Sequence, residues 1–572
     1  MKWFVALWVF CAAAIHSFSL DREAFTFTRY DLDVRVEPAQ QRLAVRGSIT
    51  LRNDSSSAQK NAVLQISSSL SWRSIQSEGK LFQFLSQPYT SDVDHTGELS
   101  EAIVRLPHEV PSGGSVELSI GYEGVILLDA TRFTRIGMPK EAAVHSDWDQ
   151  IGPAFSAVRG VGYVAWYPIA IEAGNLSQGR SLFEAIGRWK KHAQNAEMKI
   201  KLRVETNPGG TRPKMLCGED EPWPSELTTE PQEFSIDCHY SQLGLRAPSF
   251  VIANYAVLDR PVVQIAYRAE HRSNAEKFAQ AADTVAPFVT DWFGSIRSKA
   301  QVAELFDSGA SPFESGTVLL APLSDTDPKL LQMALVHELT HAAFPSPRPW
   351  IYEGLAHFAQ AAYREHQESR SAALDFMGLH RTAVVDAEKA FNTDPKDSAA
   401  KDDSLISTMT DEFYRSKAAY VWWMLRDLLG EGPLKKVLAA YKATEDRDSA
   451  YFQRLVQAET KRDLQWFFDD WVYHDRGLPD FRIESAFARQ ASQGNYLVTI
   501  TVENLGAASA EVPVTVRFDG GATSERVEVR GNAKGVVRIA AAKPPTEIAV
   551  NDGSVPESDL TNNIYMVQAL SK

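Results

Sequence analysis

The sequence predicts a multi-domain α+β protein, with an antiparallel β domain first, a mainly helical domain next and a β-sandwich last. At 572 residues the chain is longer than one hydrophobic core usually supports. Polar and apolar residues alternate from residue 20 to about 258 and again from residue 479, as they do in half-buried strands. Between these stretches apolar residues recur every three to four positions, which is the period of an amphipathic helix.

The first twenty residues, MKWFVALWVFCAAAIHSFSL, combine Lys2 with a short apolar run and small residues at Ser17 and Ser19. This pattern is typical of a secretory signal peptide, here residues 1–19. A membrane anchor is the alternative, but the apolar run is short for a spanning helix, which needs about 20 residues. We therefore expect a secreted or periplasmic protein whose mature chain has no membrane span.

The chain carries a net charge of −14 at pH 7. An acidic surface repels the phosphates of nucleic acid and the headgroups of anionic lipids. We therefore expect neither nucleic acid nor an anionic membrane as a partner.

Two cysteines, Cys217 and Cys238, remain once Cys11 is removed with the predicted signal peptide. Both lie in what the sequence predicts to be a proline-containing loop. A disulfide between them fits an oxidising compartment, and two free thiols are the alternative. Two thiols without a CxxC motif cannot close a four-ligand zinc ribbon.

Three segments follow the signal peptide, and their boundaries are predicted from changes in pattern. In residues 20–258, polar and apolar residues alternate in stretches separated by turns, which predicts the antiparallel β domain. Residues 259–478 are mainly helical, with one strand-like run, TVLLAP, at 317–322. Residues 479–572 return to alternation with Gly and Asn turns, which indicates a β-sandwich. The polar stretch NTDPKDSAAKDDSL, residues 392–405, is predicted to be a mobile loop.

The stretch HELTH, residues 337–341, carries the first chemical signal. His337 and His341 are four residues apart in a helical pattern, so they lie on one face of the predicted helix. Glu338 is close enough to take a proton from a water molecule that a metal has activated. The alternative is that HELTH only places polar residues on a structural helix.

The residues after HELTH contain the third ligand that a catalytic zinc needs. Alternating prolines at 345, 347 and 349 end the helix at Phe344 and force an extended connection. A second helical pattern, WIYEGLAHFAQAAYRE, then begins with Glu353 in its first turn. A short connection can return this helix against the first, so Glu353 is the expected third ligand. A solvated acid at a helix N-terminus is the alternative.

These motifs resemble the aminopeptidase N-like zinc metallopeptidases, which belong to the gluzincins. That family has HExxH, a spacer, and a tryptophan-containing helix with an NEGFA-like glutamate, to which WIYEGLA at 350–356 is close. The resemblance extends over about residues 25–478. The spacer here is eleven residues, 342–352, and is shorter than the family's.

The resemblance implies a thermolysin-like catalytic domain with one Zn²⁺ per chain. His337, His341 and Glu353 would be the zinc ligands, and Glu338 would be the general base. His357 lies four residues after Glu353 on the same helical face. It is expected either to orient Glu353 or to be exposed to solvent, and the sequence favours neither.

SPFESG, residues 311–316, precedes the strand-like run where the family carries GAMEN. Glu314 and Gly316 are the shared residues. The resemblance implies that Glu314 binds the free α-amino group of a substrate. An ordinary acidic residue in a turn is the alternative.

DEFYRSKAAY, residues 411–420, is similar to the family's YEKGA segment. The resemblance implies that Tyr414 donates a hydrogen bond to the oxyanion of the tetrahedral intermediate, with Tyr420 as a weaker candidate. Core packing is the alternative for both tyrosines. It is the expected role of Trp422, Trp423 and Leu425.

The C-terminal segment, with VENLGAASAEVPVTVRFDGG, looks like bacterial adhesion-type immunoglobulin-like modules. Together these resemblances imply a secreted zinc metallopeptidase that removes N-terminal residues from peptide or protein substrates. An endopeptidase is the first alternative, because a shorter spacer can leave the cleft open at both ends. The second is a surface binding protein that kept the fold and lost the chemistry. The intact set of His337, Glu338, His341, Glu353 and a tyrosine argues against the second, because a binding module has no physical need for all five.

Overall fold

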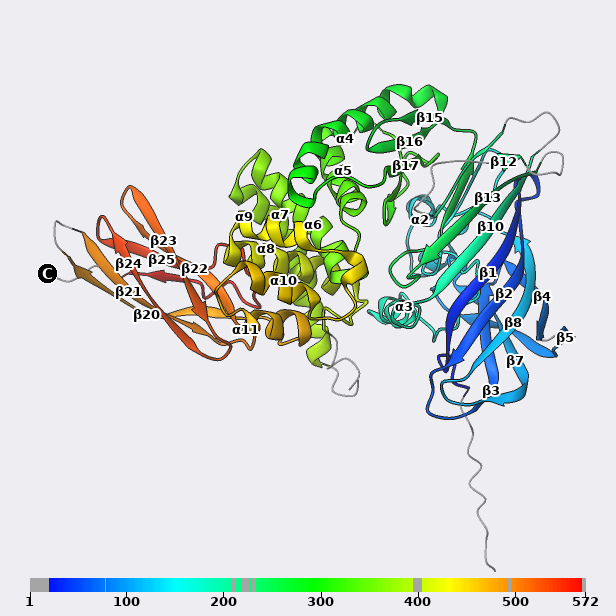
Figure 1. Cartoon of the computed structure of the whole chain (residues 1–572), viewed down its shortest axis with the longest axis horizontal. Coiled ribbons are helices and arrows are strands. Elements are labelled where there is room, and N and C mark those ends of the chain that lie inside the picture. The colour runs from blue at the N-terminus through cyan, green and yellow to red at the C-terminus, as the bar shows by residue number, and fades with distance from the viewer. Residues whose placement is uncertain are drawn as a thin grey trace, which may run out of the picture.

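The computed structural model describes residues 20–567 except 78, 207–211, 219–225, 228–232, 325, 394–403 and 492–494. The predicted signal peptide and residues 394–403 of the predicted loop lie outside the described residues. The described chain is a multi-domain α+β structure. Its three regions follow one another along the longest axis in the order of the sequence (Figure 1).

The N-terminal region is built on one large sheet. Across this sheet the strands are β12 (Glu226–Leu227), β13 (Glu233–Ser241), β10 (Glu197–Glu205), β1 (Phe25–Glu37), β2 (Arg42–Asn53), β8 (Ser115–Val125), β4 (Leu70–Ser77) and β5 (Lys80–Leu81). Neighbouring strands run antiparallel except β1 and β10, which are parallel. The predicted antiparallel domain therefore contains one parallel pair.

Two smaller sheets and three helices complete the N-terminal region. The sheets are β3 (Gln59–Ser67), β7 (Glu98–Val110) and β6 (Phe84–Thr90), and β11 (Lys214–Cys217), β14 (Phe250–Ala253) and β9 (Phe155–Val158). The helices are α1 (Thr131–Arg135), α2 (Lys140–Ser146) and α3 (Ser181–His192). In Figure 1, α3 lies on the side of the sheet that faces the helices of the middle region.

Cys217 and Cys238 form a disulfide, as predicted, with their Cα atoms 5.7 Å apart. The expectation that both lie in a loop was wrong, because Cys217 ends β11 and Cys238 lies within β13. The bond therefore joins a strand of a small sheet to a strand of the large sheet.

The middle region begins with a mixed five-stranded sheet that the sequence revealed only in part. Its strands in order are β15 (Ala256–Asp259), β16 (Val263–Tyr267), β17 (Ala300–Glu304), β19 (Val318–Ala321) and β18 (Phe313–Ser315). Only β19 was predicted, from TVLLAP. β16 and β17 are buried along their whole length, so they show no alternation of polar and apolar residues. The predicted boundary at 258/259 falls within β15, which pairs with β16.

Helices make up the rest of the middle region, as the periodicity predicted. They are α4 (Arg272–Phe293), α5 (Pro328–Ala343), α6 (Pro349–Gln367), α7 (Arg370–Thr393), the π-helical turn η4 (Glu412–Lys417), α8 (Ala418–Leu429), α9 (Glu431–Ala440), α10 (Tyr451–Glu459), α11 (Gln465–Phe468) and the π-helical turn η6 (Asp469–Tyr473). Trp422, Trp423 and Leu425 are fully buried, which confirms their predicted packing role. Among the described helices none has the length and apolar content needed to cross a membrane.

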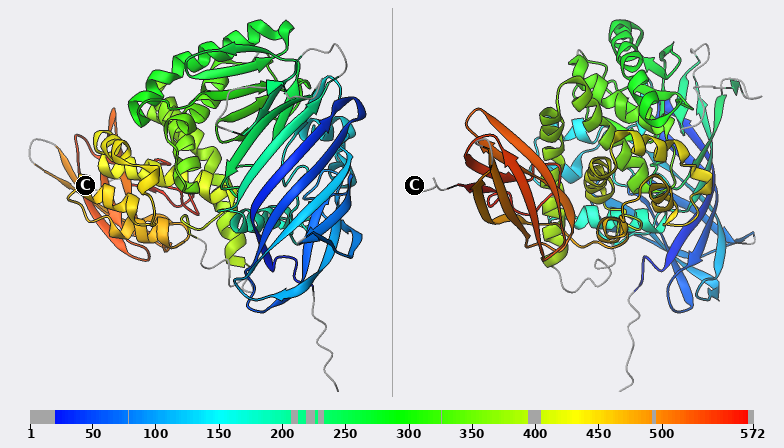
Figure 2. Two further views of the ribbon diagram at one scale, coloured as in Figure 1. Left: turned by 45° about the vertical axis from the view of Figure 1, so that its right-hand side comes forward. Right: turned by 60° about the vertical axis from the view of Figure 1, so that its left-hand side comes forward.

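The C-terminal region consists of two sheets. One contains β20 (Phe481–Gln490), β21 (Tyr496–Asn504) and β24 (Lys534–Ala541), and the other contains β23 (Gly521–Val529), β22 (Ala510–Phe518), β25 (Pro545–Val550) and β26 (Ile564–Met566). Buried valines and isoleucines of both sheets, including Val498, Val514 and Ile548, belong to one core. Trp471 of η6 donates a hydrogen bond to the carbonyl of Ser509 (2.7 Å), which attaches this region to the helices. Both turned views place it beyond the helices, on the side away from β1 and β2 (Figure 2).

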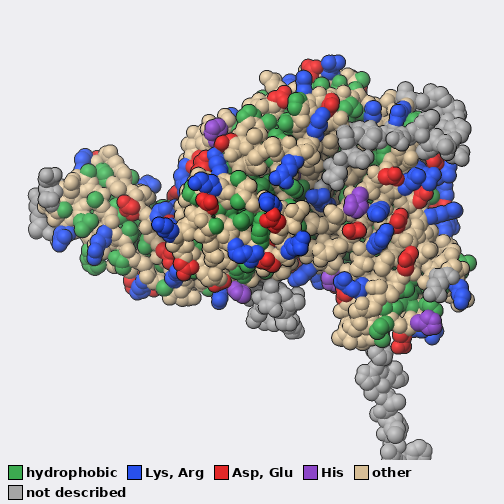
Figure 3. Space-filling model, viewed as in Figure 1, with side chains coloured by type: hydrophobic (Ala, Val, Ile, Leu, Met, Phe, Trp, Pro, Cys, Tyr) green, Lys and Arg blue, Asp and Glu red, His purple; other side chains and the backbone are tan. Residues whose placement is uncertain are grey.

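On the face shown in Figure 3, acidic and basic side chains are interspersed over all three regions. The net negative charge is thus not gathered into one patch on this face. What distinguishes the middle region is a buried group of two histidines and one glutamate.

Candidate metal centre

Helices α5 and α6 form a hairpin whose shape follows from its prolines. Asp327 caps α5 by accepting a hydrogen bond from the amide of Lys329 (2.9 Å), and Pro328 occupies the first helical turn, where no amide donor is lost. The helix ends at Ala343, close to the predicted end at Phe344. After a short connection α6 begins at Pro349, so Glu353 lies in its first two turns and faces α5.

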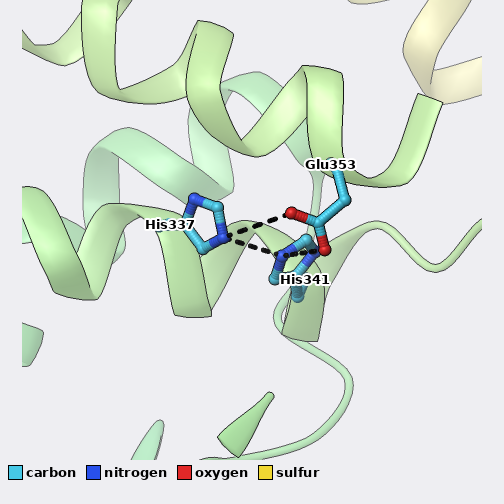
Figure 4. Close-up of side chains that lie close together, drawn as sticks. All are labelled: His337, His341 and Glu353. Atoms are coloured by element: carbon cyan, nitrogen blue, oxygen red, sulfur yellow. Dashed lines mark hydrogen bonds and ion pairs between the residues drawn. The ribbon is translucent and has the colours of Figure 1, made fainter. Parts of the chain in front are cut away.

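His337, His341 and Glu353 converge in this hairpin (Figure 4). The Nε2 atoms of the two histidines are 3.0 Å apart. Glu353 places Oε1 3.6 Å from Nε2 of His341 and Oε2 3.9 Å from Nε2 of His337. One ligand atom from each residue lies within 4.8 Å of the others. The three residues that the sequence predicted as ligands therefore form one group.

The three residues of this group are buried, and His341 has the protonation state that a metal ion requires. His337, His341 and Glu353 are 1%, 3% and 4% exposed. Burial is the largest cause that lowers the pKa of His341 well below its usual value, and the neighbouring His337 is the second. His341 is therefore neutral at pH 7. A neutral imidazole has the lone pair that binds a metal. Two imidazole nitrogens and one carboxylate are the donors of many catalytic zinc sites, which keep a fourth position open. The group therefore fits a metal ion.

Glu338 lies next to His337 on α5 and is fully buried. Its place in the sequence puts it within one residue of a ligand candidate. A carboxylate in this position is suited to accept a proton beside a metal site.

Glu314 reaches the same group from β18 at the edge of the five-stranded sheet. Its Oε2 atom is 3.7 Å from Nε2 of His337. The side chain of Glu314 is 33% exposed, whereas that of His337 is 2% exposed, so Glu314 lies on the solvent side of the group. Gly316 follows in the turn from β18 to β19 with φ of +62°, a conformation that glycine adopts without strain.

Arg415 is a residue of this site that the sequence analysis missed. It lies in η4, and its Nε atom is 3.1 Å from Oε2 of Glu353. Burial alone would lower the pKa of Arg415, but nearby negative charges, of which that of Glu353 contributes most, raise it overall. Arg415 is therefore always charged. An arginine in a segment rich in aromatic residues was a usable signal, because a charge in such surroundings needs a partner. The identity of that partner is a property of the tertiary structure.

Tyr414 precedes Arg415 in η4 and is buried. Its hydroxyl donates a hydrogen bond to Asp411, and the ammonium of Lys190 donates to the same hydroxyl (3.2 Å). Burial raises the pKa of Tyr414, with the carboxylates of Asp411 and Glu353 adding to this effect, so the phenol keeps its proton at pH 7. Tyr414 thus adjoins Arg415, which pairs with Glu353, and its proton is directed at Asp411.

Tyr420 lies in the core of the helical region. Its hydroxyl donates a hydrogen bond to the carbonyl of Met377 in α7 (2.8 Å), and the side chain is 1% exposed. This position favours core packing, which was the alternative to a catalytic role. Tyr414 is then the one of these two tyrosines that adjoins Arg415, the partner of Glu353.

His357 packs against His337, with 4.8 Å between the ring centroids. Its Nδ1 atom is 3.1 Å from Oε1 of Gln360, and burial lowers the pKa of His357 well below its usual value. The side chain is half-buried, so it is not fully exposed to solvent. The ring supports a candidate ligand, but that ligand is His337 and not Glu353.

No protein-family model matches this chain, and no curated protein does either. The resemblance drawn from HELTH and WIYEGLA therefore rests on these motifs. Independently of that resemblance, the described residues contain a buried His-His-Glu group that can hold a metal ion.

Proposed function

We propose that this protein is a secreted zinc metallopeptidase that removes N-terminal residues from peptides. The observation that carries the proposal is the convergence of His337, His341 and Glu353 in a buried position, with Glu338 on the same helix. A helix with a purely structural role gains nothing from burying these four side chains together, because the burial of ionisable groups costs free energy. Zinc is the proposed metal because two imidazoles and one carboxylate leave one of its four positions open.

In this proposal, His337, His341 and Glu353 hold the ion. Zinc in such a site would supply a Lewis acid, which polarises the scissile carbonyl and lowers the pKa of the attacking water. Glu338 takes the proton from the attacking water and passes it to the leaving amine. Tyr414 donates a hydrogen bond to the oxyanion of the tetrahedral intermediate.

Glu314 supports an aminopeptidase in preference to an endopeptidase. Its carboxylate lies 3.7 Å from His337 on the solvent side of the site, where it can bind a cation. The free α-amino group of a peptide is such a cation. It belongs to the residue whose carbonyl forms the first peptide bond, so its distance from that bond is fixed. An anion at a fixed distance from the metal therefore selects cleavage at the N-terminus.

Two further features support the proposed architecture and location. We propose that the middle region is a thermolysin-like catalytic domain, since its sheet borders the helices that carry the metal group. We propose an immunoglobulin-like module for the C-terminal region, since its two sheets share one core. The Cys217–Cys238 disulfide supports a secreted or periplasmic location, where the environment is oxidising.

A pair of matched reporters tests the proposed function. The purified chain is assayed with an aminoacyl p-nitroanilide and with the same compound acetylated on its amine, before and after a zinc chelator and after zinc is restored. Zinc-dependent cleavage of the unblocked compound alone is the expected result. Equal cleavage of suitable blocked and unblocked peptides would point to an endopeptidase. No cleavage by a zinc-loaded chain would point to a binding protein.

A further inference from the structure

Helix α3 of the N-terminal region contacts the segment that carries Tyr414. The ammonium of Lys190 donates hydrogen bonds to Oδ1 of Asp411 (2.8 Å) and to the hydroxyl of Tyr414 (3.2 Å). At the start of the same helix, Arg180 forms an ion pair with Glu412 (3.0 Å). Two cations of the N-terminal region thus pair with two consecutive acids of the helical region, beside the candidate metal centre.

The hydroxyl of Tyr414 has one proton, and in this structure Asp411 accepts it. Lys190 can only donate, so it contacts the lone pairs of the Tyr414 oxygen and of Asp411. A phenol that donates to Asp411 cannot at the same time donate to an oxyanion at the metal centre. The proposed role of Tyr414 therefore requires its proton to turn away from Asp411 during the reaction.

Lys190 has the properties needed to make that turn favourable. Its side chain is 23% exposed, and it already donates to Asp411 when Tyr414 does. When the phenol O–H turns away from Asp411, Asp411 still accepts a hydrogen bond from the ammonium of Lys190. The ammonium also polarises the phenol by donating to its oxygen, and hydrogen bonds in such a chain strengthen one another.

We propose that Lys190 is a positioning residue supplied by the N-terminal region, which holds the Tyr414 oxygen and lets the phenol O–H, still protonated, turn its hydrogen bond from Asp411 to the oxyanion. This inference rests on the proposed function. It adds that the N-terminal region contributes a residue to the proposed catalytic site, in addition to packing beside it. An ordinary ion pair between two regions is the competing explanation.

A double-mutant cycle separates these explanations. Lys190→Met, Tyr414→Phe and the double variant are compared with the full-length zinc-loaded chain on the unblocked reporter, with kcat and KM measured separately. We expect Tyr414→Phe to lower kcat about 10²-fold or more, as the loss of an oxyanion donor does. We expect Lys190→Met to lower kcat about tenfold with KM unchanged, and to have no further effect in the Tyr414→Phe background.

Two further variants and two physical measurements complete the test. Lys190→Arg, which keeps a cation, is expected to recover part of the rate. Arg180→Gln breaks the neighbouring ion pair and is expected to leave kcat unchanged. Zinc content and thermal unfolding are measured for each variant, and both are expected to stay close to those of the unsubstituted chain.

The outcomes distinguish the inference from the proposed function. A Lys190→Met chain with the original kcat, or with an equal loss in both backgrounds, overturns the inference while the proposed function stands. Tyr414→Phe at the original rate also overturns it, because Tyr414 would then not be the oxyanion donor. If the unsubstituted zinc-loaded chain cleaves no peptide, the proposed function fails, and the inference fails with it.

Discussion

The two halves of the candidate site are assembled over very different sequence distances. The metal half, His337, His341 and Glu353, comes from one helical hairpin of α5 and α6. The other half comes from three separate elements, with Glu314 on β18, Tyr414 and Arg415 in η4, and Lys190 on α3. The comparison teaches that local chain geometry suffices to place metal ligands, whereas the groups around a substrate depend on how whole regions pack.

This difference has a mechanical consequence. The α5–α6 hairpin is held by its own contacts and by the buried aromatic core around Trp350 and Trp422. The substrate half is held by contacts between regions, such as Lys190 with Asp411. We therefore expect changes in the substrate half to alter catalysis while the metal remains bound.

The largest expected effect comes from Glu338, the proposed general base next to the metal half. Glu338→Gln keeps the shape of the side chain and removes the proton acceptor, so kcat is expected to fall at least about 10²- to 10⁴-fold. Zinc content is expected to stay at one ion per chain, because Glu338 is not a ligand. Rates are measured on the unblocked reporter, with exposed Glu276→Gln as the control. An unchanged rate in Glu338→Gln would remove the general base from the account.

A smaller effect is expected from Glu314, which belongs to the substrate half. Glu314→Gln removes the charge that we propose binds the α-amine, and the loss of a charged hydrogen bond is expected to lower kcat/KM about 10- to 100-fold. The preference for the unblocked over the acetylated reporter is expected to shrink with it. Zinc content, measured by elemental analysis, is expected not to change. A variant that kept the full preference would assign amine binding to another residue.

The smallest effect concerns the packing of α6, which carries Glu353, against α8, the helix that continues η4. A Cβ atom on Gly354 would lie 2.6 Å from Cβ of Ala418 and 3.1 Å from the Trp422 ring, so Gly354→Ala forces α6 and α8 apart. Overpacking costs about 1–3 kcal/mol and the gain in helix propensity offsets about 1 kcal/mol. We expect a net loss of about 1 kcal/mol in unfolding free energy, lower kcat and unchanged zinc binding.

Gly378→Ala is the matched control for that variant. Gly378 is an exposed residue within α7, and no atom lies within 4 Å of the position its Cβ would take. Denaturant unfolding is therefore expected to show an unchanged or slightly higher stability. If Gly354→Ala were as stable as this control, α6 and α8 would not be as closely packed as the structure has them.

The metal half could be predicted from the sequence because its signals are local. A four-residue spacing aligned His337 with His341, and three prolines predicted the end of α5 and the start of α6. The disulfide was predicted because Cys217 and Cys238 are the two cysteines that remain once the predicted signal peptide is left out. Glu314 reached the site as the family resemblance implied, although its role stays a prediction.

The rest of the site could not be predicted because it depends on long-range contacts. Lys190 and Asp411 are 221 residues apart, and nothing in either local sequence indicates the other. Arg415 contacts Glu353 only because η4 packs against α6. The five-stranded sheet was largely missed because its short buried strands lack alternation, and with it the edge that positions Glu314.

The central claim is that Glu353 completes a zinc site with the two histidines. The most direct test measures the metal content of the purified chain and of Glu353→Ala by elemental analysis after dialysis against limiting zinc. The account predicts about one zinc per chain, and loss of zinc from a variant that still folds, as judged by circular dichroism. A well-folded unsubstituted chain that binds no zinc, or a Glu353→Ala chain that binds as much, would contradict it.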